Sequence, residues 1–146
     1  MRSIRALSIM FGAIAGVVGP AGASAAMSDS HSAKFSICSQ GPRTNCVVDG
    51  DTFWFRGQKI RIADIDTPEL SPPRCEREAR LGEAAKYRLL GLLNDGAFSL
   101  ARGSRDEDRN GRKLRTVLRR GSSIGNILIA EGLARPWKGH RRSWCG

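Results

Sequence analysis

The sequence predicts a small α+β domain in which short strands form a β-barrel, with α-helices between and after them. Short runs in the first part of the domain alternate apolar and polar residues with a period of two. A longer run with apolar residues at helical spacing follows. The chain has 146 residues, 40% hydrophobic and 26% charged, which suits one globular domain and excludes a multidomain machine.

Residues 1–26 are predicted to precede the fold. Two positive charges in Met1–Arg5, an apolar run over Ala6–Val18 and small residues over Ala21–Ala26 are the three regions of a secretory signal peptide, with cleavage near residues 25–26. An uncleaved anchor is the alternative, but an apolar run of about 13 residues is too short to cross a bilayer as a helix. We therefore expect a protein in the periplasm or secreted, with no membrane attachment after cleavage.

The rest of the chain is basic. We expect a flexible polar tail over 27–33 and a single domain, acting as a monomer, over 34–146. The chain has 24 Lys and Arg against 14 Asp and Glu, and loss of Arg2 and Arg5 leaves 22 against 14, a formal charge of +8. Such a field attracts polyanions, either nucleic acid or anionic lipid headgroups.

Four runs in the first part of the domain predict strands. Phe53 and Phe55 alternate with Thr52 and Trp54, and Gly57 marks a turn before the next alternating run, so the last two runs are expected to form a β-hairpin. The predicted strands are Phe35–Cys38, Cys46–Asp49, Thr52–Arg56 and Gln58–Ile65.

Two helices are expected in the second part. Prolines make Leu70–Arg74 a loop, and a helix should begin at Glu76 or Glu78 and end at Leu93. The elements expected after it are a strand over Ala97–Arg102, a charged loop over Gly103–Gly111, a strand over Arg112–Arg119, a helix over Ile124–Glu131 capped by Ser122-Ser123, and an irregular basic segment over Leu133–Cys145. This order of elements indicates a five-stranded Greek-key barrel of the OB type.

The four cysteines are expected to form two disulfides. An even number of cysteines behind a signal peptide favours disulfides, and the lack of CxxC pairs disfavours a zinc site. Of the three possible pairings we favour Cys38–Cys46, a local clip, with Cys75–Cys145 tying distant segments together. In the loop-entropy description they contribute about 2.5 and about 4.4 kcal/mol.

Three carboxylates lie at turns close to the predicted hairpin, namely Asp51, Asp66 and Glu69. Taken singly, each has the ordinary interpretation of a solvated turn residue. If the hairpin brings residue 51 beside residue 66, the converging negative charges need a cation or raised pKa values. Carboxylates together with a backbone carbonyl such as that of Thr67 suit Ca²⁺ or Mg²⁺ better than zinc.

Two arginines could complete a site for phosphate chemistry. Arg61 lies in the same hairpin, where it is either a structural ion-pair partner or a phosphate ligand. Arg112 follows Asn110-Gly111 in the charged loop. Two arginines and a metal ion would meet the negative charge that grows on phosphorus during phosphodiester hydrolysis.

Five motifs together resemble the staphylococcal nuclease (thermonuclease) family, from about residue 46 to residue 138. The motifs are Val47–Phe53 (VVDGDTF), Arg61–Glu69 (RIADIDTPE), Gly82–Ala84 (GEA), Asp108–Arg112 (DRNGR) and Gly132–Arg135 (GLAR). The second motif is the most specific. The resemblance implies an OB-fold barrel with three helices, so we expect two to three here. It also implies Ca²⁺-dependent hydrolysis of DNA and RNA with little sequence specificity, which leaves 3′-phosphate ends.

The resemblance also implies roles for individual residues. Asp51 and Asp66 would hold Ca²⁺ together with the backbone carbonyl of Thr67. Glu69 would hold or deprotonate the attacking water. The scissile phosphate would be bound by Arg61 and Arg112. Asp108 would brace the loop that carries the second of these arginines.

Further substrate contacts, beyond the metal-binding and catalytic residues, are expected on the basic segment. Trp137 offers a surface on which a base could stack. A salt-sensitive approach surface is expected from Arg135, Lys138, Arg141 and Arg142. The family's tyrosines around the nucleotide are not matched, because the chain's one tyrosine, Tyr87, falls inside the predicted helix.

Two other functions are considered. A noncatalytic OB-fold module that binds nucleic acid has no need of an acidic cluster opposing its ligand's charge, so the enzyme is favoured. A cationic protein that adheres to membranes should have a basic amphipathic helix, but the first predicted helix also carries Glu76, Glu78 and Glu83.

Overall fold

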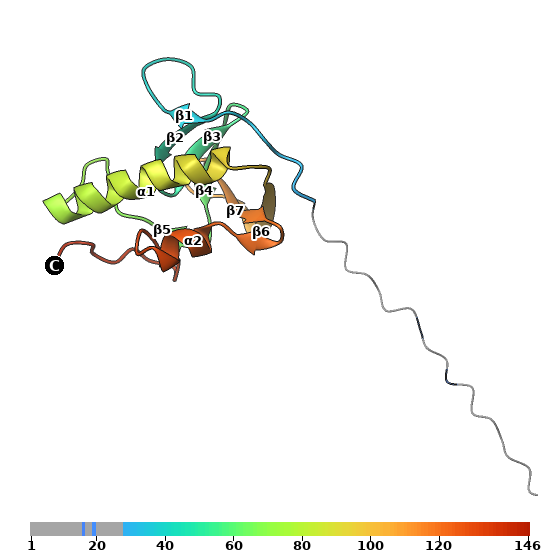
Figure 1. Ribbon diagram of the computed structural model, residues 1–146. Helices are drawn as coiled ribbons and strands as arrows, with labels where there is room; N and C mark the ends of the chain where they lie inside the picture. Colours follow the sequence, from blue (N-terminus) through green and yellow to red (C-terminus); the bar gives the residue numbers. More distant parts are fainter. Residues whose placement is uncertain (1–15, 17–18, 20–27) are drawn as a thin grey trace, which may run out of the picture.

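The structure, a computed structural model, describes residues 16, 19 and 28–146 (Figure 1). The signal peptide predicted over 1–26 therefore lies outside the described residues, apart from two isolated positions. The strands are β1 (Ser36–Ile37), β2 (Cys46–Asp49), β3 (Thr52–Phe55), β4 (Gln58–Ile62), β5 (Ile65–Asp66), β6 (Ser99–Glu107), β7 (Lys113–Arg119), β8 (Ser122–Ser123) and β9 (Arg135–Pro136), and the helices are α1 (Glu76–Asn94) and α2 (Gly125–Ala130). These residues do not include the third helix that the resemblance implies.

The larger sheet is mixed. Its strands follow the order β1-β2-β3-β4-β7-β6, with β8 paired to β7, and β5 and β9 form a separate two-stranded sheet. The β1–β2 and β4–β7 pairs are parallel, and the other pairs are antiparallel. The α+β class is thus confirmed. The described pairs form an open path, and the five-stranded Greek-key barrel stays a prediction.

The predicted hairpin is formed by β3 and β4. Thr52 pairs with Arg61, and Phe53 pairs with Ile60. The turn takes positive φ angles at Arg56 and Gly57, 49° and 79°, which is the geometry that a two-residue hairpin turn needs. The alternation of residues in the two strands therefore sends Phe53, Phe55 and Ile60 to one face and Arg61 to the other.

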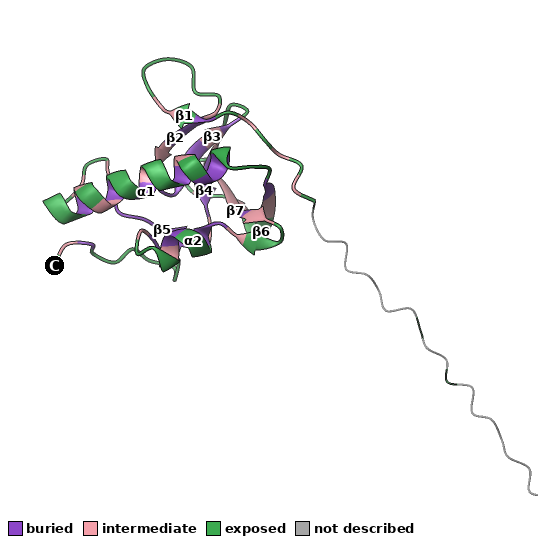
Figure 2. Ribbon diagram, in the orientation of Figure 1, coloured by how far each residue is buried: buried purple, intermediate pink, exposed green. Residues whose placement is uncertain are grey.

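Helix α1 lies across the larger sheet and closes one side of the core (Figure 1). It buries one face and exposes the other (Figure 2). The buried apolar residues that the helix contributes to the core are Leu89, Leu92 and Leu93. The strands contribute Val47, Phe53, Phe55, Ile60, Ile62, Ile65 and Val117, and Phe98 joins them from the position just before β6. Burial of these side chains stabilises the arrangement by about 1.5–3 kcal/mol each.

Two predicted strands differ from the structure by more than two residues at one end, and the others by at most one residue. The run Gln58–Ile65 is broken by a turn after Ile62, so that Ile65 joins β5 instead. The strand predicted to end at Arg102 continues through most of the predicted charged loop to Glu107. Polar residues continue it because Asp106 ion-pairs with Lys113, at 2.9 Å, and with Arg115, at 2.8 Å, on the neighbouring strand. Cross-strand charge pairs stabilise a sheet without apolar alternation.

The described part of the predicted tail makes specific contacts. His31 exchanges backbone hydrogen bonds of 2.9 Å with Phe98, and its ring meets the edge of Phe55 at 5.4 Å between centroids. Asp29 accepts a hydrogen bond from the backbone of Arg120. Asp29 and His31 therefore contact the domain from within the segment 27–33, for which a flexible tail is predicted, and residue 27 is not among the described residues.

Both favoured disulfides are present. Cys38 is bonded to Cys46 and Cys75 to Cys145, with Cα–Cα distances of 4.9 and 6.0 Å. No helix in the described part of the chain is long and apolar enough to cross a membrane.

Candidate active site

Two of the predicted acids share one buried arginine. Asp51 lies in the turn between β2 and β3, Arg61 on β4 and Asp66 on β5, and their exposed fractions are 2%, 6% and 4%. The Arg61 Nη2 atom lies 3.2 Å from Asp51 Oδ2 and 3.7 Å from Asp66 Oδ1. The hairpin therefore brings residues 51 and 66 together, with a positive charge between them.

The Arg61 guanidinium is fixed before any substrate binds. Its Nη1 atom donates to the carbonyl oxygens of Ile62 and Ile65, the second at 2.9 Å. The pairing of Thr52 with Arg61 places the arginine beside the turn that carries Asp51. A donor held by this many contacts needs little reorganisation when negative charge develops next to it.

Two glycines let the acidic turns pack closely against α1. A Cβ on Gly50 would lie 2.6 Å from Ala85 Cβ and 3.0 Å from Thr67 Cβ. A Cβ on Gly82 would lie 2.7 Å from Leu70 Cδ2. The glycines of the DGDT and GEA motifs therefore set how close the site approaches the helix.

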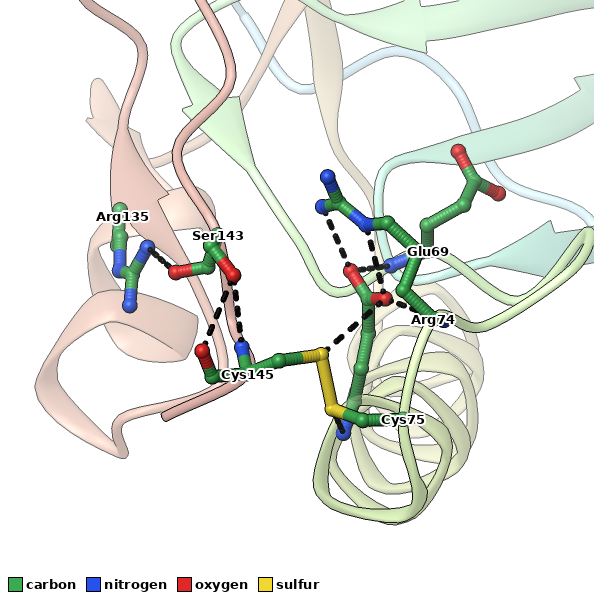
Figure 3. Close-up of a disulfide and its surroundings, with 7 residues drawn as sticks. Glu69, Arg74, Cys75, Arg135, Ser143 and Cys145 are labelled. Atoms are coloured by element: carbon green, nitrogen blue, oxygen red, sulfur yellow. Dashed lines mark hydrogen bonds and ion pairs between the residues drawn. A yellow bond between two sulfur atoms is a disulfide. The ribbon is translucent and has the colours of Figure 1, made fainter.

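Glu69 lies in the loop before α1, and a buried acid on the helix holds that loop. Glu78 is fully buried, and its carboxylate accepts from the backbone N–H of Glu69 at 3.3 Å and of Arg74 at 2.7 Å. The Arg74 guanidinium also pairs with Glu78, at 3.0 Å. Figure 3 shows the Glu69 side chain extending away from this pair and from the nearby Cys75–Cys145 disulfide.

Arg112 is braced as the sequence predicts. Asp108 accepts from the Arg112 backbone N–H at 3.0 Å and from its Nε at 2.6 Å. Burial of Asp108 would raise its pKa, but the hydrogen bonds from Arg112 and Asn110 outweigh that effect and hold the pKa below its ordinary value. Within the described residues the terminal nitrogens of Arg112 make no further hydrogen bond, so they remain available to a ligand.

Arg61, Glu69 and Arg112 all line one open cavity of about 690 Å³. Five arginines line it, namely Arg61, Arg105, Arg109, Arg112 and Arg141, together with Glu69, Trp137 and His140. Trp137 is 39% exposed, and its ring lies 5.6 Å from the Arg61 guanidinium carbon. The cavity is therefore a cationic pocket with the indole surface of Trp137 and two carboxylates, Glu69 and the arginine-paired Asp108, which is the chemistry that a phosphodiester and a base require.

Two of the predicted substrate residues lie elsewhere. The described lining of the cavity does not include Arg135 or Lys138. Arg135 stacks on Trp144, 3.8 Å from the ring centroid, and donates to the carbonyl of Ser143 at 2.9 Å. Lys138 is exposed outside the cavity. A charge count along the segment could not distinguish these positions from Arg141, which does reach the cavity.

Burial shifts the pKa values of two acids beside the site. Burial, with a smaller contribution from Asp51, raises the pKa of Asp49 to about 8. Burial also raises the pKa of Asp66, while Arg141 and Arg61 act in the opposite direction. Burial disfavours the charged form of both carboxyl groups, and an added positive charge beside them would oppose that effect.

The buried oxygen atoms at the site suit a hard cation. Asp66 Oδ1 and Thr67 Oγ1 are buried and accept or donate no hydrogen bond in the structure. Both Asp51 oxygens accept hydrogen bonds, Oδ1 from Thr52 and Oδ2 from the backbone of Thr67. No three acidic, His or Cys side chains converge as a metal cluster in the described residues. A cation here would thus depend on two carboxylates, backbone carbonyl oxygen and water, a donor set that Ca²⁺ accepts.

A curated relative shares the chain's sequence over its central part. The chain is 37% identical over 94 residues to the Bacillus subtilis (strain 168) protein named Endonuclease YncB, which covers 60% of this chain and 44% of the relative. The chain thus spans less than half the length of that relative.

The family described as staphylococcal nuclease homologue matches residues 59–143. This range includes Arg61, Glu69 and Arg112, which line one cavity, and Asp66, which ion-pairs with Arg61, and it begins after Asp51. A match over more than half of the sequence, with the motif residues converging in this way, means that the chain belongs to the family of staphylococcal nuclease homologues.

Proposed function

We propose that this protein is a nuclease that hydrolyses phosphodiester bonds of DNA and RNA with little sequence specificity and leaves 3′-phosphate ends. The observation that carries the proposal is that Arg61, Arg112 and Glu69 line the same cavity, and that Arg61 also pairs with the buried acids Asp51 and Asp66. Family membership and the endonuclease-named relative support the reaction class.

The two arginines bind the scissile phosphate from fixed positions. Arg61 is held by two carbonyls and two carboxylates, and Arg112 is oriented by Asp108 through Nε. Negative charge that develops on the phosphoryl oxygens is met by donors that do not have to move, which is the largest contribution an enzyme makes to such a reaction. Glu69, 31% exposed at its side chain, holds the attacking water or takes its proton.

Asp51, Asp66 and the backbone carbonyl of Thr67 would hold the cation, for which Ca²⁺ is the proposed ion. When bound, the ion supplies positive charge beside the phosphate and favours the ionised water. In the same proposal Trp137 stacks a base, and the arginines at the cavity edge attract the polyanion.

Several finer expectations belong to the same proposal. The larger sheet and the β5–β9 pair together form the OB-type barrel. The signal peptide is removed near residues 25–26, and the monomer acts in the periplasm or outside the cell. Two disulfides support an oxidising compartment.

The experiment is a cleavage assay on plasmid DNA and on RNA with Ca²⁺, with Mg²⁺ and with a calcium chelator. We expect cleavage of both substrates with Ca²⁺ and none with the chelator. Undiminished cleavage in the chelator contradicts the metal assignment. Binding of nucleic acid without cleavage under any condition favours the alternative, a noncatalytic binding module.

Two substitutions test the residues. We expect Glu69→Gln and Arg112→Ala each to lower turnover by about 10²–10³-fold, because each removes a group that acts on the transition state. Glu83→Gln and Arg80→Ala, exposed on α1 in ion pairs with Lys86 and Glu76, are the matched controls. Wild-type rates in the first two variants contradict the assignment.

A further inference from the structure

A third arginine reaches the acids of the site from a distant segment. Arg141 belongs to the strap, which we define as residues 135–146. Its Nη1 atom lies 3.4 Å from Asp66 Oδ1 and 3.4 Å from Glu69 Oε2. One guanidinium nitrogen thus bridges the proposed cation ligand and the proposed water-binding acid. The Arg141 side chain is 37% exposed and lines the cavity.

Contacts on both sides of Arg141 hold the strap in place. Before it, β9 pairs with β5, with Arg135 opposite Asp66, and Trp137 donates its backbone N–H to the carbonyl of Asp64 at 2.9 Å. After it, Trp144 is buried and Cys145 is bonded to Cys75 at the start of α1. The strap is therefore held to the domain both before and after Arg141.

The Asp66 oxygen that Arg141 approaches is the buried one without a hydrogen bond, Oδ1. A divalent cation bound at this oxygen would meet the guanidinium at short range, and like charges so close repel strongly. The guanidinium and the cation therefore compete for the same carboxylates.

We propose that Arg141 is a built-in competitor of the cation: it neutralises Asp66 and Glu69 when the site is empty of metal, and it raises the Ca²⁺ concentration at which the site fills. This inference rests on the proposed function, because it takes Asp66 as a cation ligand. It adds a positioning residue that sets the threshold for metal binding, and the strap is the element that delivers it.

The chain offers a matched control beside Arg141. Arg142 carries the same charge on the same strap and is exposed, and it makes no ion pair within the described residues. Arg141→Gln and Arg142→Gln change the net charge equally, so a difference between them reports the contacts with Asp66 and Glu69 rather than the overall field.

The test is calorimetric titration of the mature protein with CaCl₂ alone, without nucleic acid. Loss of two partly exposed ion pairs changes an equilibrium constant by about threefold to tenfold. Because these ion pairs oppose Ca²⁺ binding, Arg141→Gln should lower the Kd for Ca²⁺ by that factor. Arg142→Gln should change it less than twofold. Arg141→Lys, which keeps the charge but not the planar guanidinium, should lie between wild type and Arg141→Gln.

Thermal unfolding gives a second readout that does not depend on activity. With a chelator we expect Arg141→Gln to have a lower Tm than Arg142→Gln. Saturating Ca²⁺ should then raise the Tm of Arg141→Gln by more than it raises the Tm of Arg142→Gln. An unchanged or weaker Ca²⁺ affinity in Arg141→Gln overturns the inference while leaving the calcium site intact. No Ca²⁺ binding by wild type or by any variant overturns the calcium assignment itself, and the inference with it.

Discussion

Replacing Glu78 with glutamine tests how the loop that carries Glu69 is held. The ionised carboxylate accepts from the Arg74 backbone at 2.7 Å, from its Nε at 3.2 Å and Nη2 at 3.0 Å, and from the Glu69 backbone at 3.3 Å. The four donors converge on two oxygens. A glutamine offers one oxygen and one NH₂ group, so at least one donor would face another donor. Glu78→Gln therefore loses both charge and acceptor capacity.

The expected cost is about 2–3 kcal/mol of unfolding free energy at pH 7. Hydrogen bonds to a charged acceptor contribute about 1.5–3 kcal/mol, and breaking a fully buried pair costs about 3–5 kcal/mol. The Arg74 side chain is 53% exposed and can recover water when its partner is lost, which keeps the cost below the upper range. We also expect kcat to fall about tenfold, since the loop places Glu69.

The pH dependence has a definite sign. Hydrogen bonds from Arg74, opposed by burial, lower the pKa of Glu78 from 4.5 to about 2. The unfolded chain takes up the proton as pH falls below about 4.5, whereas the folded chain resists until about 2. The stabilisation is therefore complete above pH 4.5 and is lost towards pH 2. The gap between wild type and Glu78→Gln should narrow over that range.

Urea unfolding followed by circular dichroism, with the disulfides intact, measures both effects. Glu83→Gln is the control, because Glu83 is half-exposed on the same helix and pairs with Lys86, a contact worth about 0.2–0.5 kcal/mol. The reasoning is refuted if Glu78→Gln is as stable as Glu83→Gln at pH 7, or if the gap stays constant from pH 7 to pH 2.5.

Three further predictions follow from packing and cross-links. Gly50→Ala puts a methyl group 2.6 Å from the nearest side-chain carbon of α1 and should cost about 1–3 kcal/mol, while Gly103→Ala, with open space around it, should cost little; thermal unfolding compares them. The double variant Cys75→Ser/Cys145→Ser should lose about 4.4 kcal/mol in the loop-entropy description, measured by urea unfolding, and an unchanged midpoint contradicts it. Trp137→Ala should weaken binding of a short single strand by about 1–3 kcal/mol per stacked base in a fluorescence titration, and unchanged affinity excludes stacking there.

Local patterns predicted the hairpin and its chemistry. Period-two alternation determines on which face of β4 the Arg61 side chain lies. The two-residue turn at Arg56 and Gly57 sets the pairing of β3 with β4, so that Arg61 lies opposite Thr52, next to Asp51. Asp66 follows four residues after Ile62, so the acids and the arginine meet through short-range geometry. These features can be predicted from the sequence because few other backbone conformations are compatible with this turn and this alternation.

Contacts across long sequence separations could not be predicted in the same way. In the sequence Glu78 is one of three acids of the predicted helix with nothing to set it apart, yet it is fully buried because the preceding loop folds back onto it. Arg141 looked the same as Arg142 in a basic run, and only the strap's pairing with β5 separates them. The extension of β6 to Glu107 depends on charge pairs across strands, which the pattern of hydrophobic residues does not reveal.

The bonds from Glu78 to the loop have a consequence for motion. The backbone N–H groups of Glu69 and Arg74 donate hydrogen bonds to the carboxylate of Glu78, which lies in the first turn of α1. Those two amides can exchange with solvent when the first turn of α1 opens. We therefore expect them to share one opening free energy with the amides of that turn in hydrogen exchange, as a single cooperative unit. The loop before the helix then behaves as part of the helix, and Glu69 keeps its position on the timescale of helix opening.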